Sequence, residues 1–300
     1  MNNISKSIGF IGIGLMGNSL IQRFSNCNQK IYAYDKDKKT LSGIKIKNVH
    51  SVNNAAEIAK KCDVIFICVD KTENVEHVVF DDNGIIQNAT ENTIIIDLST
   101  TLVNETIKFA EKFKHKTGGA WIDAPVSGGP EKALHGTLSI MVGGNKKDIN
   151  IISPLLDIIS KKFTYFGPTG SGQVVKMINQ ILVLNNYTIL AEALSFAKAW
   201  GIDAKAIPDA LNDGHAGSNL LMTLFPRMIN KDFEPQGYTS QILKDLKMIS
   251  QLAEEKNVPI PMSTLSKQLF TIHANKSEQN LDGISIIKLF DKNKKIREII

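Results

Sequence analysis

Lys176 and Asn179 place a titratable amine and a carboxamide three positions apart in an apolar stretch. Residues at this spacing share one face of a helix. A lysine held in a partly dry cleft has its charged form disfavoured, which lowers its pKa towards the range where it exchanges protons near neutral pH. Taken alone, however, the residue type favours a surface lysine at position 176, whose stem covers apolar atoms while its amine stays in water.

A second group of residues has the spacing of a phosphate-binding turn. Gly12, Gly14 and Gly17 form G-x-G-x-x-G directly after an apolar run and before a helical pattern. The first glycine permits a tight turn, the second lets the backbone approach a pyrophosphate, and the third lets helix and strand pack closely. The helix N-terminus adds amides and a positive dipole. Asp35 ends the next strand, about 20 residues on, where an acid meets the ribose hydroxyls of a dinucleotide.

Asp35 also bears on which dinucleotide is bound. Its charge repels a 2′-phosphate and no arginine follows it, so the sequence favours NAD. NADP stays open as an alternative because three lysines follow closely: Lys36, Lys38 and Lys39. A plain glycine-rich turn with a surface aspartate is the remaining, non-binding interpretation of these residues.

The composition sets the class of protein. With 300 residues, 43% hydrophobic and 22% charged, the chain is typical of a globular protein and not of a disordered one or a disulfide scaffold. The net charge of +5 is too small and too scattered for a nucleic-acid binder. Cys27, Cys62 and Cys68 form no CxxC pair, which indicates free thiols, and no metal-ligand spacing occurs. No apolar run approaches the ~20 residues of a membrane span, so we expect a cytoplasmic protein.

The elements that must position these residues alternate between strand and helix over the first two-thirds of the chain, as in parallel βαβ units. We expect an N-terminal, doubly wound sheet of the Rossmann type. The predicted strands are 8–13, 30–34, 63–69, 93–97, 120–123, 137–142 and 162–165, and the helices between the early ones are 17–25, 54–60 and 103–113.

The pattern changes after a glycine-rich break at 167–172. One long helix is predicted from about Gln173 to Trp200, ended by Gly201, with a length of about 40 Å. Further helical patterns follow at 205–212, 220–228, 240–256, 263–275 and 284–290. We therefore expect two domains: a Rossmann NAD(P)-binding domain over 1–168 and an all-α domain for substrate binding and oligomerisation over 169–300.

Several motifs occur in order along nearly the whole chain: 9–17, 123–129, 136–144 and 172–179, followed by Lys244-Asp245-Leu246. Together they resemble the β-hydroxyacid dehydrogenase family, whose members include 3-hydroxyisobutyrate dehydrogenase, tartronate semialdehyde reductase and glyoxylate/succinic semialdehyde reductase. The resemblance implies an NAD(P)-dependent oxidoreductase acting on CH–OH groups. Its expected reaction interconverts a small, carboxylate-bearing β-hydroxy acid and its semialdehyde by hydride transfer.

The resemblance also assigns roles to residues. It implies that Lys176 is the general acid/base, that Asn179 holds the same substrate oxygen, and that the loop Ser127-Gly128-Gly129 grips the substrate carboxylate. It implies that the following residues bind the cofactor: Gly12, Ile13, Gly14, Leu15, Met16, Gly17, Asp35, Val69, Asp70, Asn74, Thr100 and Lys244. The chain departs from the family at Cys68-Val69-Asp70, where Leu-Pro is common.

Alternatives remain within and outside this family. An NADPH-dependent glyoxylate or succinic semialdehyde reductase fits the same motifs. An imine reductase usually lacks the catalytic lysine, and a non-catalytic dinucleotide-binding relative would have lost Lys176 or the Ser127 loop, whereas both are present. By the same resemblance, the expected partners are further copies of the chain, in a homodimer or homotetramer.

Overall fold

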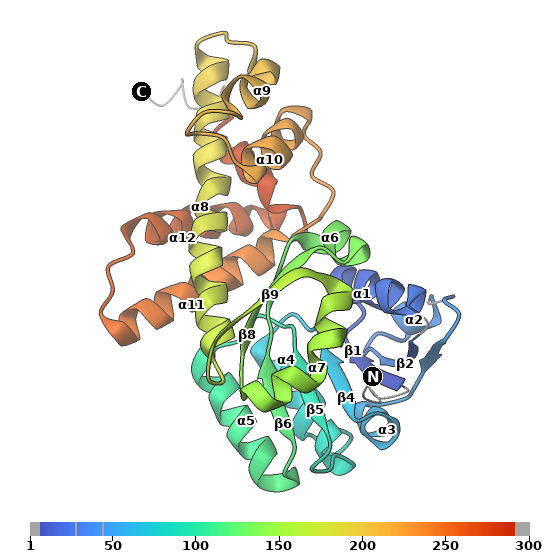
Figure 1. Ribbon diagram of the computed structural model, residues 1–300. Coiled ribbons are helices and arrows are strands. Elements are labelled where there is room, and N and C mark those ends of the chain that lie inside the picture. Colours follow the sequence, from blue (N-terminus) through green and yellow to red (C-terminus); the bar gives the residue numbers. More distant parts are fainter. Residues whose placement is uncertain (1–6, 28, 44, 292–300) are drawn as a thin grey trace. The chain divides into compact units, whose positions relative to one another are not determined.

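The computed structural model describes residues 7–27, 29–43 and 45–291, which form two compact units that divide after Lys176. The first unit combines a sheet with helices, and the regular elements in the described part of the second are helices, apart from an isolated β-bridge between Tyr238 and Asp282 (Figure 1). No helix in the described ranges is both long and apolar enough to cross a membrane.

The described part of the first unit contains one nine-stranded sheet in the order β3-β2-β1-β4-β5-β6-β8-β7, with β9 paired to β8. The strands β1 to β6 pair in parallel, in the order typical of the Rossmann fold. Strand β8 is antiparallel to β6 and β7 and parallel to β9. The strands are β1 (Ser7–Ile11), β2 (Lys30–Tyr34), β3 (Val49–Ser51), β4 (Val64–Ile67), β5 (Ile94–Asp97), β6 (Ala120–Asp123), β7 (Val126–Ser127), β8 (Leu138–Gly143) and β9 (Ser160–Gly167).

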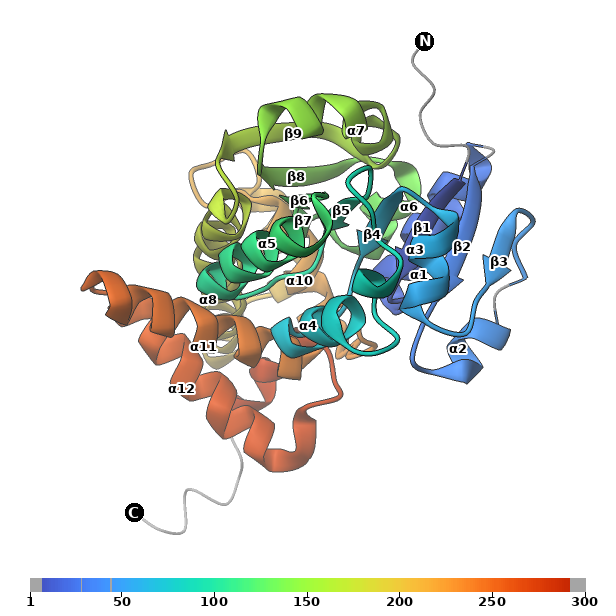
Figure 2. The same cartoon turned by 90° about the horizontal axis from the view of Figure 1, so that it is seen from below.

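Helices cover both faces of this sheet, which explains why β4 and β5 are almost wholly apolar and buried along their length. Apolar side chains of α1, α6 and α7 form a core on one face, and those of α3, α4 and α5 form a core on the other. Figure 2 shows α7 and α5 on opposite sides of the strands. The helices are α1 (Leu15–Asn26), α2 (Lys38–Ser42), α3 (Ala55–Lys61), α4 (Thr72–Phe80), α5 (Val103–Thr117), α6 (Gly129–His135) and α7 (Lys146–Ile159).

Helix α8 (Ser171–Ala199) is continuous over 29 residues and carries the chain from the first unit into the second. Its first turns reverse the usual pattern of an amphipathic helix. The polar residues Gln173, Lys176 and Gln180 lie three and four positions apart on one face and are buried. The apolar side chains of Ile178 and Leu182 are 52% and 65% exposed. A buried polar stripe of this kind requires hydrogen-bond partners.

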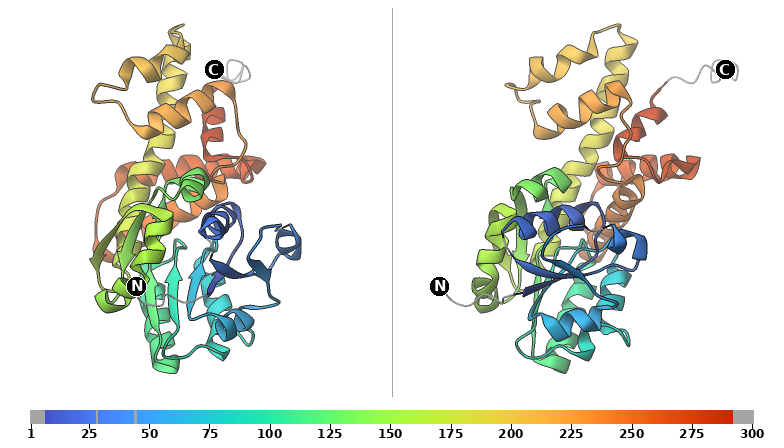
Figure 3. Two further views of the ribbon diagram at one scale, coloured as in Figure 1. Left: turned by 45° about the vertical axis from the view of Figure 1, so that its right-hand side comes forward. Right: turned by 90° about the vertical axis from the view of Figure 1, so that its right-hand side faces the viewer.

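The second unit contains α8 from Met177 onward and the helices that follow it. They are α9 (Ile207–Leu211), α10 (Asn219–Asn230), α11 (Thr239–Lys256) and α12 (Pro261–His273), with a π-helix at Ala274–Glu278 and a 3₁₀ helix at Gly283–Leu289. Helices α11 and α12 pack side by side (Figure 3, orange to red). Asn257, the residue after α11, adopts the left-handed conformation that commonly ends a helix.

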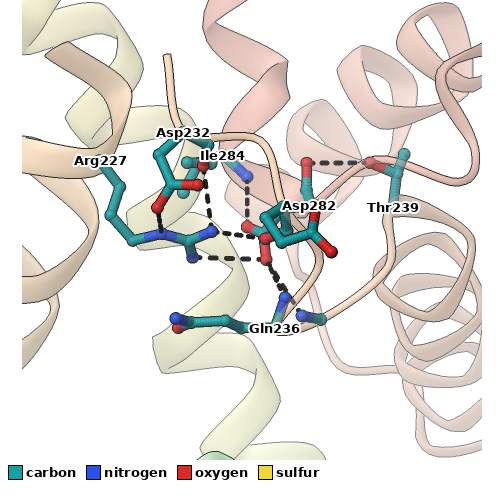
Figure 4. Close-up of polar contacts among 8 residues, drawn as sticks. Arg227, Asp232, Gln236, Thr239, Asp282 and Ile284 are labelled. Carbon is teal, nitrogen blue, oxygen red and sulfur yellow. Dashed lines mark hydrogen bonds and ion pairs between the residues drawn. The ribbon is translucent and has the colours of Figure 1, made fainter. Parts of the chain in front are cut away.

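A buried carboxylate connects the segment between α10 and α11 to the start of the 3₁₀ helix Gly283–Leu289. Asp282 accepts hydrogen bonds from the backbone N–H groups of Gln236 (2.7 Å) and Gly237 (3.1 Å), and it caps Ile284 (3.1 Å). Arg227 pairs with Asp282 at 3.4 Å and also bonds to Asp232 (Figure 4). The charge of Asp282 is therefore compensated within the unit, as burial of a carboxylate requires.

Candidate active site

The glycine-rich loop between β1 and α1 contains two glycines that the fold requires and a third, Gly14, that faces open space. A Cβ atom at Gly17 would collide with the carbonyl of Gly12, and Gly12 itself has φ +91°, so the fold requires both glycines. A Cβ atom at Gly14 would meet no atom within 4 Å. Gly14 is also the N-cap of α1 and offers no capping side chain. The backbone next to Leu15 and Met16 is thus open to an anion at a helix N-terminus.

Asp35 is fixed against this loop by two backbone donors. Its Oδ2 accepts a hydrogen bond from the N–H of Ile13 at 2.6 Å, and its Oδ1 accepts one from the N–H of Asp37 at 2.8 Å. The structure therefore brings together two predicted cofactor residues that are 22 positions apart. The half-buried carboxylate lies at the end of β2, as the dinucleotide-binding pattern requires.

The segments after β4 and β5 meet at the same edge of the sheet. The N–H of Val69 donates to the hydroxyl of Ser99 at 3.0 Å, which places Val69 beside the segment that contains Thr100. Asp70 and Asn74 engage each other, with the side-chain amide donating to the carboxylate at 2.6 Å. These four predicted cofactor residues lie at the carboxyl ends of parallel strands, where doubly wound folds bind ligands.

The start of α8 is held by a buried carboxylate at the end of β6. Asp123 accepts hydrogen bonds from the N–H of Gly170 (2.8 Å) and from the N–H of Gln173 (3.1 Å). Burial raises the pKa of Asp123 above the usual carboxyl range, and the backbone donors oppose that rise. A Cβ atom at Gly172 would collide with the carbonyl of Met141, so a glycine is needed for this close approach.

Lys176 is buried beside the loop that was predicted to bind a carboxylate. Its side chain is 8% exposed, and its Nζ donates to the carbonyl of Val126 at 2.8 Å. The surface-lysine interpretation is therefore wrong. Ser127 follows Val126 in β7, and Gly128 and Gly129 have φ values of +137° and +78°, which only glycine adopts readily. No atom lies within 4 Å of a Cβ built on Gly129, so this backbone is open to a bound group.

The remaining predicted residues belong to a polar cluster of the second unit. The side-chain amide of Asn179 donates to Oε1 of Gln180 at 2.8 Å, and Gln180 in turn donates to Asp245. The Nζ of Lys244 lies 3.2 Å from Oδ1 of Asp245. Asn179 and Lys244 are thus connected through Gln180 and Asp245.

Four buried residues that hold these groups were not among the predicted site residues: Asp123, Gln173, Gln180 and Asp245. One signal was available, namely the polar residues 173, 176 and 180 at helical spacing in an otherwise apolar segment. Within the described residues, no group of three His, Cys, Asp or Glu side chains is arranged to hold a metal ion.

The sheet order, the open glycine loop and the fixed Asp35 define a dinucleotide-binding α/β protein. Family models match both parts of the chain. Residues 7–167 match the NAD binding domain of 6-phosphogluconate dehydrogenase, and residues 170–290 match the NAD-binding domain of NADP-dependent 3-hydroxyisobutyrate dehydrogenase.

Individual proteins support the same relationship. The chain is 36% identical to the oxidoreductase YkwC of Bacillus subtilis, over 96% of this chain and 100% of the relative. It is 32% identical to 2-hydroxy-3-oxopropionate reductase of Escherichia coli, over 95% and 97%. The fold matches a crystal structure of 3-hydroxyisobutyrate dehydrogenase from Salmonella typhimurium with a TM-score of 0.86, at 23% identity and over 94% and 99% of the two chains.

The chain therefore belongs to the β-hydroxyacid dehydrogenase family. It is an NAD(P)-dependent oxidoreductase acting on CH–OH donors, which confirms the class expected from its motifs.

Proposed function

We propose that the protein interconverts a small β-hydroxy acid and its semialdehyde with NAD, as a 3-hydroxyisobutyrate dehydrogenase-like enzyme. The buried amine of Lys176 beside the Ser127–Gly129 loop carries this proposal. A carboxylate-binding loop and a proton donor next to each other suit a substrate whose carboxylate and carbonyl are separated by a short chain.

In the first unit, one group of residues binds the substrate and another residue transfers the proton. The Ser127 hydroxyl and the N–H groups of Gly128 and Gly129 bind the substrate carboxylate. Lys176 gives a proton to the substrate oxygen during reduction and takes it back during oxidation, while the bond to Val126 fixes the direction of its amine. The nicotinamide, when bound, supplies the hydride chemistry.

The cofactor contacts in this proposal follow the open positions of the first unit. The pyrophosphate lies against the loop Gly12–Gly17, with Ile13, Leu15 and Met16 in it, and Asp35 meets the adenosine ribose. Thr100, Val69, Asp70 and Asn74 lie nearer the nicotinamide half. Asn179 and Lys244 belong to the second unit, and their roles towards substrate and cofactor rest on the family resemblance.

The choice of NAD over NADP rests on Asp35. Two backbone donors hold its carboxylate, so it cannot swing aside to admit a 2′-phosphate of the same charge. The alternative, an NADPH-dependent glyoxylate or succinic semialdehyde reductase, is supported by the exposed side chains of Lys36, Lys38 and Lys39 in the next segment.

A substrate panel tests the proposed function. Reduction of succinic, tartronate and methylmalonate semialdehydes and of glyoxylate is followed with NADH and then NADPH, and oxidation of 3-hydroxyisobutyrate and D-glycerate with NAD. We expect turnover of at least one compound, and we expect reduction to be faster with NADH than with NADPH. Binding of NADH without turnover of any compound would support a non-catalytic dinucleotide-binding relative instead.

We further propose a cytoplasmic homodimer or homotetramer. Large apolar side chains on α8 and just after it are exposed within the single chain, including Leu182, Phe196 and Trp200, and such residues suit burial between copies. Light scattering on the purified protein is expected to give a multiple of the chain mass, and a monomer would contradict this part of the proposal.

A further inference from the structure

We propose that Gln173 is a positioning residue for proton transfer, holding the turn of α8 that carries Lys176 to the backbone on both sides of Thr100. This inference rests on the proposed function. Gln173 touches neither the proposed substrate loop nor the proton, so it would act through Lys176 and Thr100.

The side chain of Gln173 is fully buried and makes two opposite hydrogen bonds to one short segment. Its Nε2 donates to the carbonyl of Ser99 at 2.8 Å, and its Oε1 accepts from the N–H of Thr101 at 3.1 Å. The two backbone groups flank Thr100, so the carboxamide pairs with this segment as a neighbouring strand would. A carboxamide offers a neutral donor and an acceptor side by side at any pH, whereas a carboxyl group does so only when it is protonated.

The main chain of Gln173 is held independently of its side chain. Its N–H donates to Asp123, which also accepts from Gly170. On the other side, Ser99 accepts from the N–H of Val69, and the N–H of Ser99 donates to Asp97 at 2.9 Å. A chain of hydrogen bonds therefore connects the ends of β4, β5 and β6 to the first turn of α8.

Lys176 lies three residues beyond Gln173, on the same face of α8. Gln173 bonds to the segment proposed to lie near the nicotinamide ribose, and Lys176 bonds to Val126 beside the proposed substrate loop. One helical turn thus sets the spacing between the two proposed loops. An error of about 1 Å in such a spacing costs about 100-fold in rate, because the reacting groups no longer meet in the productive geometry.

The test compares Gln173→Met, which keeps the length of the side chain and removes both hydrogen bonds, with the wild-type enzyme. Asn145→Ala serves as a stability control, because Asn145 is exposed and its side chain caps α7 in the same unit. For each protein, kcat, KM, the Kd for NADH and the primary deuterium isotope effect with NADH labelled at the transferred position are measured below the onset of unfolding.

We expect kcat of Gln173→Met to fall about 10- to 100-fold, with a larger isotope effect and a nearly unchanged Kd for NADH. Asn145→Ala is expected to keep the wild-type kcat and isotope effect. A Gln173→Met enzyme with wild-type values would overturn the inference, and so would an equal loss of kcat in Asn145→Ala.

Gln173→Glu covers the case in which the methionine variant does not fold. A protonated carboxyl group offers a donor and an acceptor, like the carboxamide, whereas the carboxylate faces the carbonyl of Ser99 without a proton. The activity of this variant relative to wild type should therefore rise as the pH falls, and a constant ratio contradicts the inference.

If the wild-type enzyme turns over no substrate, the proposed function fails and this inference falls with it. If the wild-type enzyme is active and Gln173→Met is equally active, the inference about Gln173 is wrong while the proposed function stands.

Discussion

The amine of Lys176 is held 2.8 Å from the carbonyl of Val126, a residue 50 positions earlier in the chain. Val126 is paired with Ile140 of β8, so its carbonyl belongs to the sheet and not to a free loop. The hydrogen bond therefore places the proposed proton donor next to Ser127, the first residue of the proposed carboxylate loop. Helix α8 contributes the lysine, and the antiparallel extension of the sheet contributes the loop.

Ser127→Ala should weaken substrate binding selectively. Loss of a hydroxyl bonded to a carboxylate is expected to lower kcat/KM for a semialdehyde acid about 10-fold or more, mainly through KM. Ser139, which is paired with Ser127 across β7 and β8 and is exposed, provides the matched control Ser139→Ala. Steady-state kinetics on both variants check this, and an unchanged KM in Ser127→Ala would show that the carboxylate binds elsewhere.

Gly14→Ala should separate cofactor binding from folding. Because a Cβ atom at Gly14 meets nothing within 4 Å, the variant is expected to unfold at nearly the wild-type temperature while the methyl group keeps the pyrophosphate at a distance. We predict a Kd for NADH raised about 10-fold or more, measured by fluorescence titration. Gly237→Ala, also in open space but in the second unit, should leave this Kd unchanged. Equal NADH affinity in Gly14→Ala and wild type would place the pyrophosphate elsewhere.

Asp35→Asn should shift the cofactor preference towards NADPH. Removing the fixed charge relieves its repulsion of a 2′-phosphate, and the ratio of kcat/KM for NADPH over NADH is expected to rise about 10-fold or more. Asp37→Ser is a neighbouring control, because serine can still cap α2. A ratio that moves equally in both variants, or in neither, means that another group contacts the ribose.

The buried His273 should make the folded protein less stable in mild acid. Its ring is fully buried with Nε2 2.7 Å from the Ser285 hydroxyl, and burial lowers its pKa to about 4. Nearby Glu278 raises this pKa, and Lys288 and Lys276 lower it. Between about pH 4 and the ordinary histidine pKa of 6.5, the ring binds a proton in the unfolded chain but not in the folded chain.

The contribution of His273 to stability is therefore complete above pH 6.5 and declines as the pH falls towards about 4, by at most about 3 kcal/mol. Urea unfolding at neutral pH and at about pH 5 measures the change. His273→Gln should reduce the difference between the two conditions, and the same difference in both proteins would remove His273 as its cause.

The glycine loop, Asp35 and most strands of the sheet could be predicted because each depends on residues close in sequence. The elements missed were short or carried conflicting signals. Strand β7 has two residues and exists only because it pairs with β8. Helix α7 contains Pro154, a residue that usually ends a helix, yet its apolar face packs against the sheet and outweighs that tendency.

The support of the candidate site could not be predicted from spacing. The bonds of Gln173 reach 72 and 74 residues back along the chain, and those of Asp123 reach 47 and 50 residues forward. Such partners are decided by the fold. The same holds for Lys176, whose burial and contact with Val126 both depend on the fold.

The most direct test of the central claim is a comparison of Lys176→Met with Lys198→Met. Both lysines lie on α8, but Lys198 is exposed and pairs with Asp291 near the far end of the helix. We predict that Lys176→Met loses about 100-fold or more in kcat while its Kd for NADH stays close to that of wild type, and that Lys198→Met retains both. A Lys176→Met enzyme that reduces the semialdehyde at the wild-type rate would contradict the account, because the proton would then come from another group.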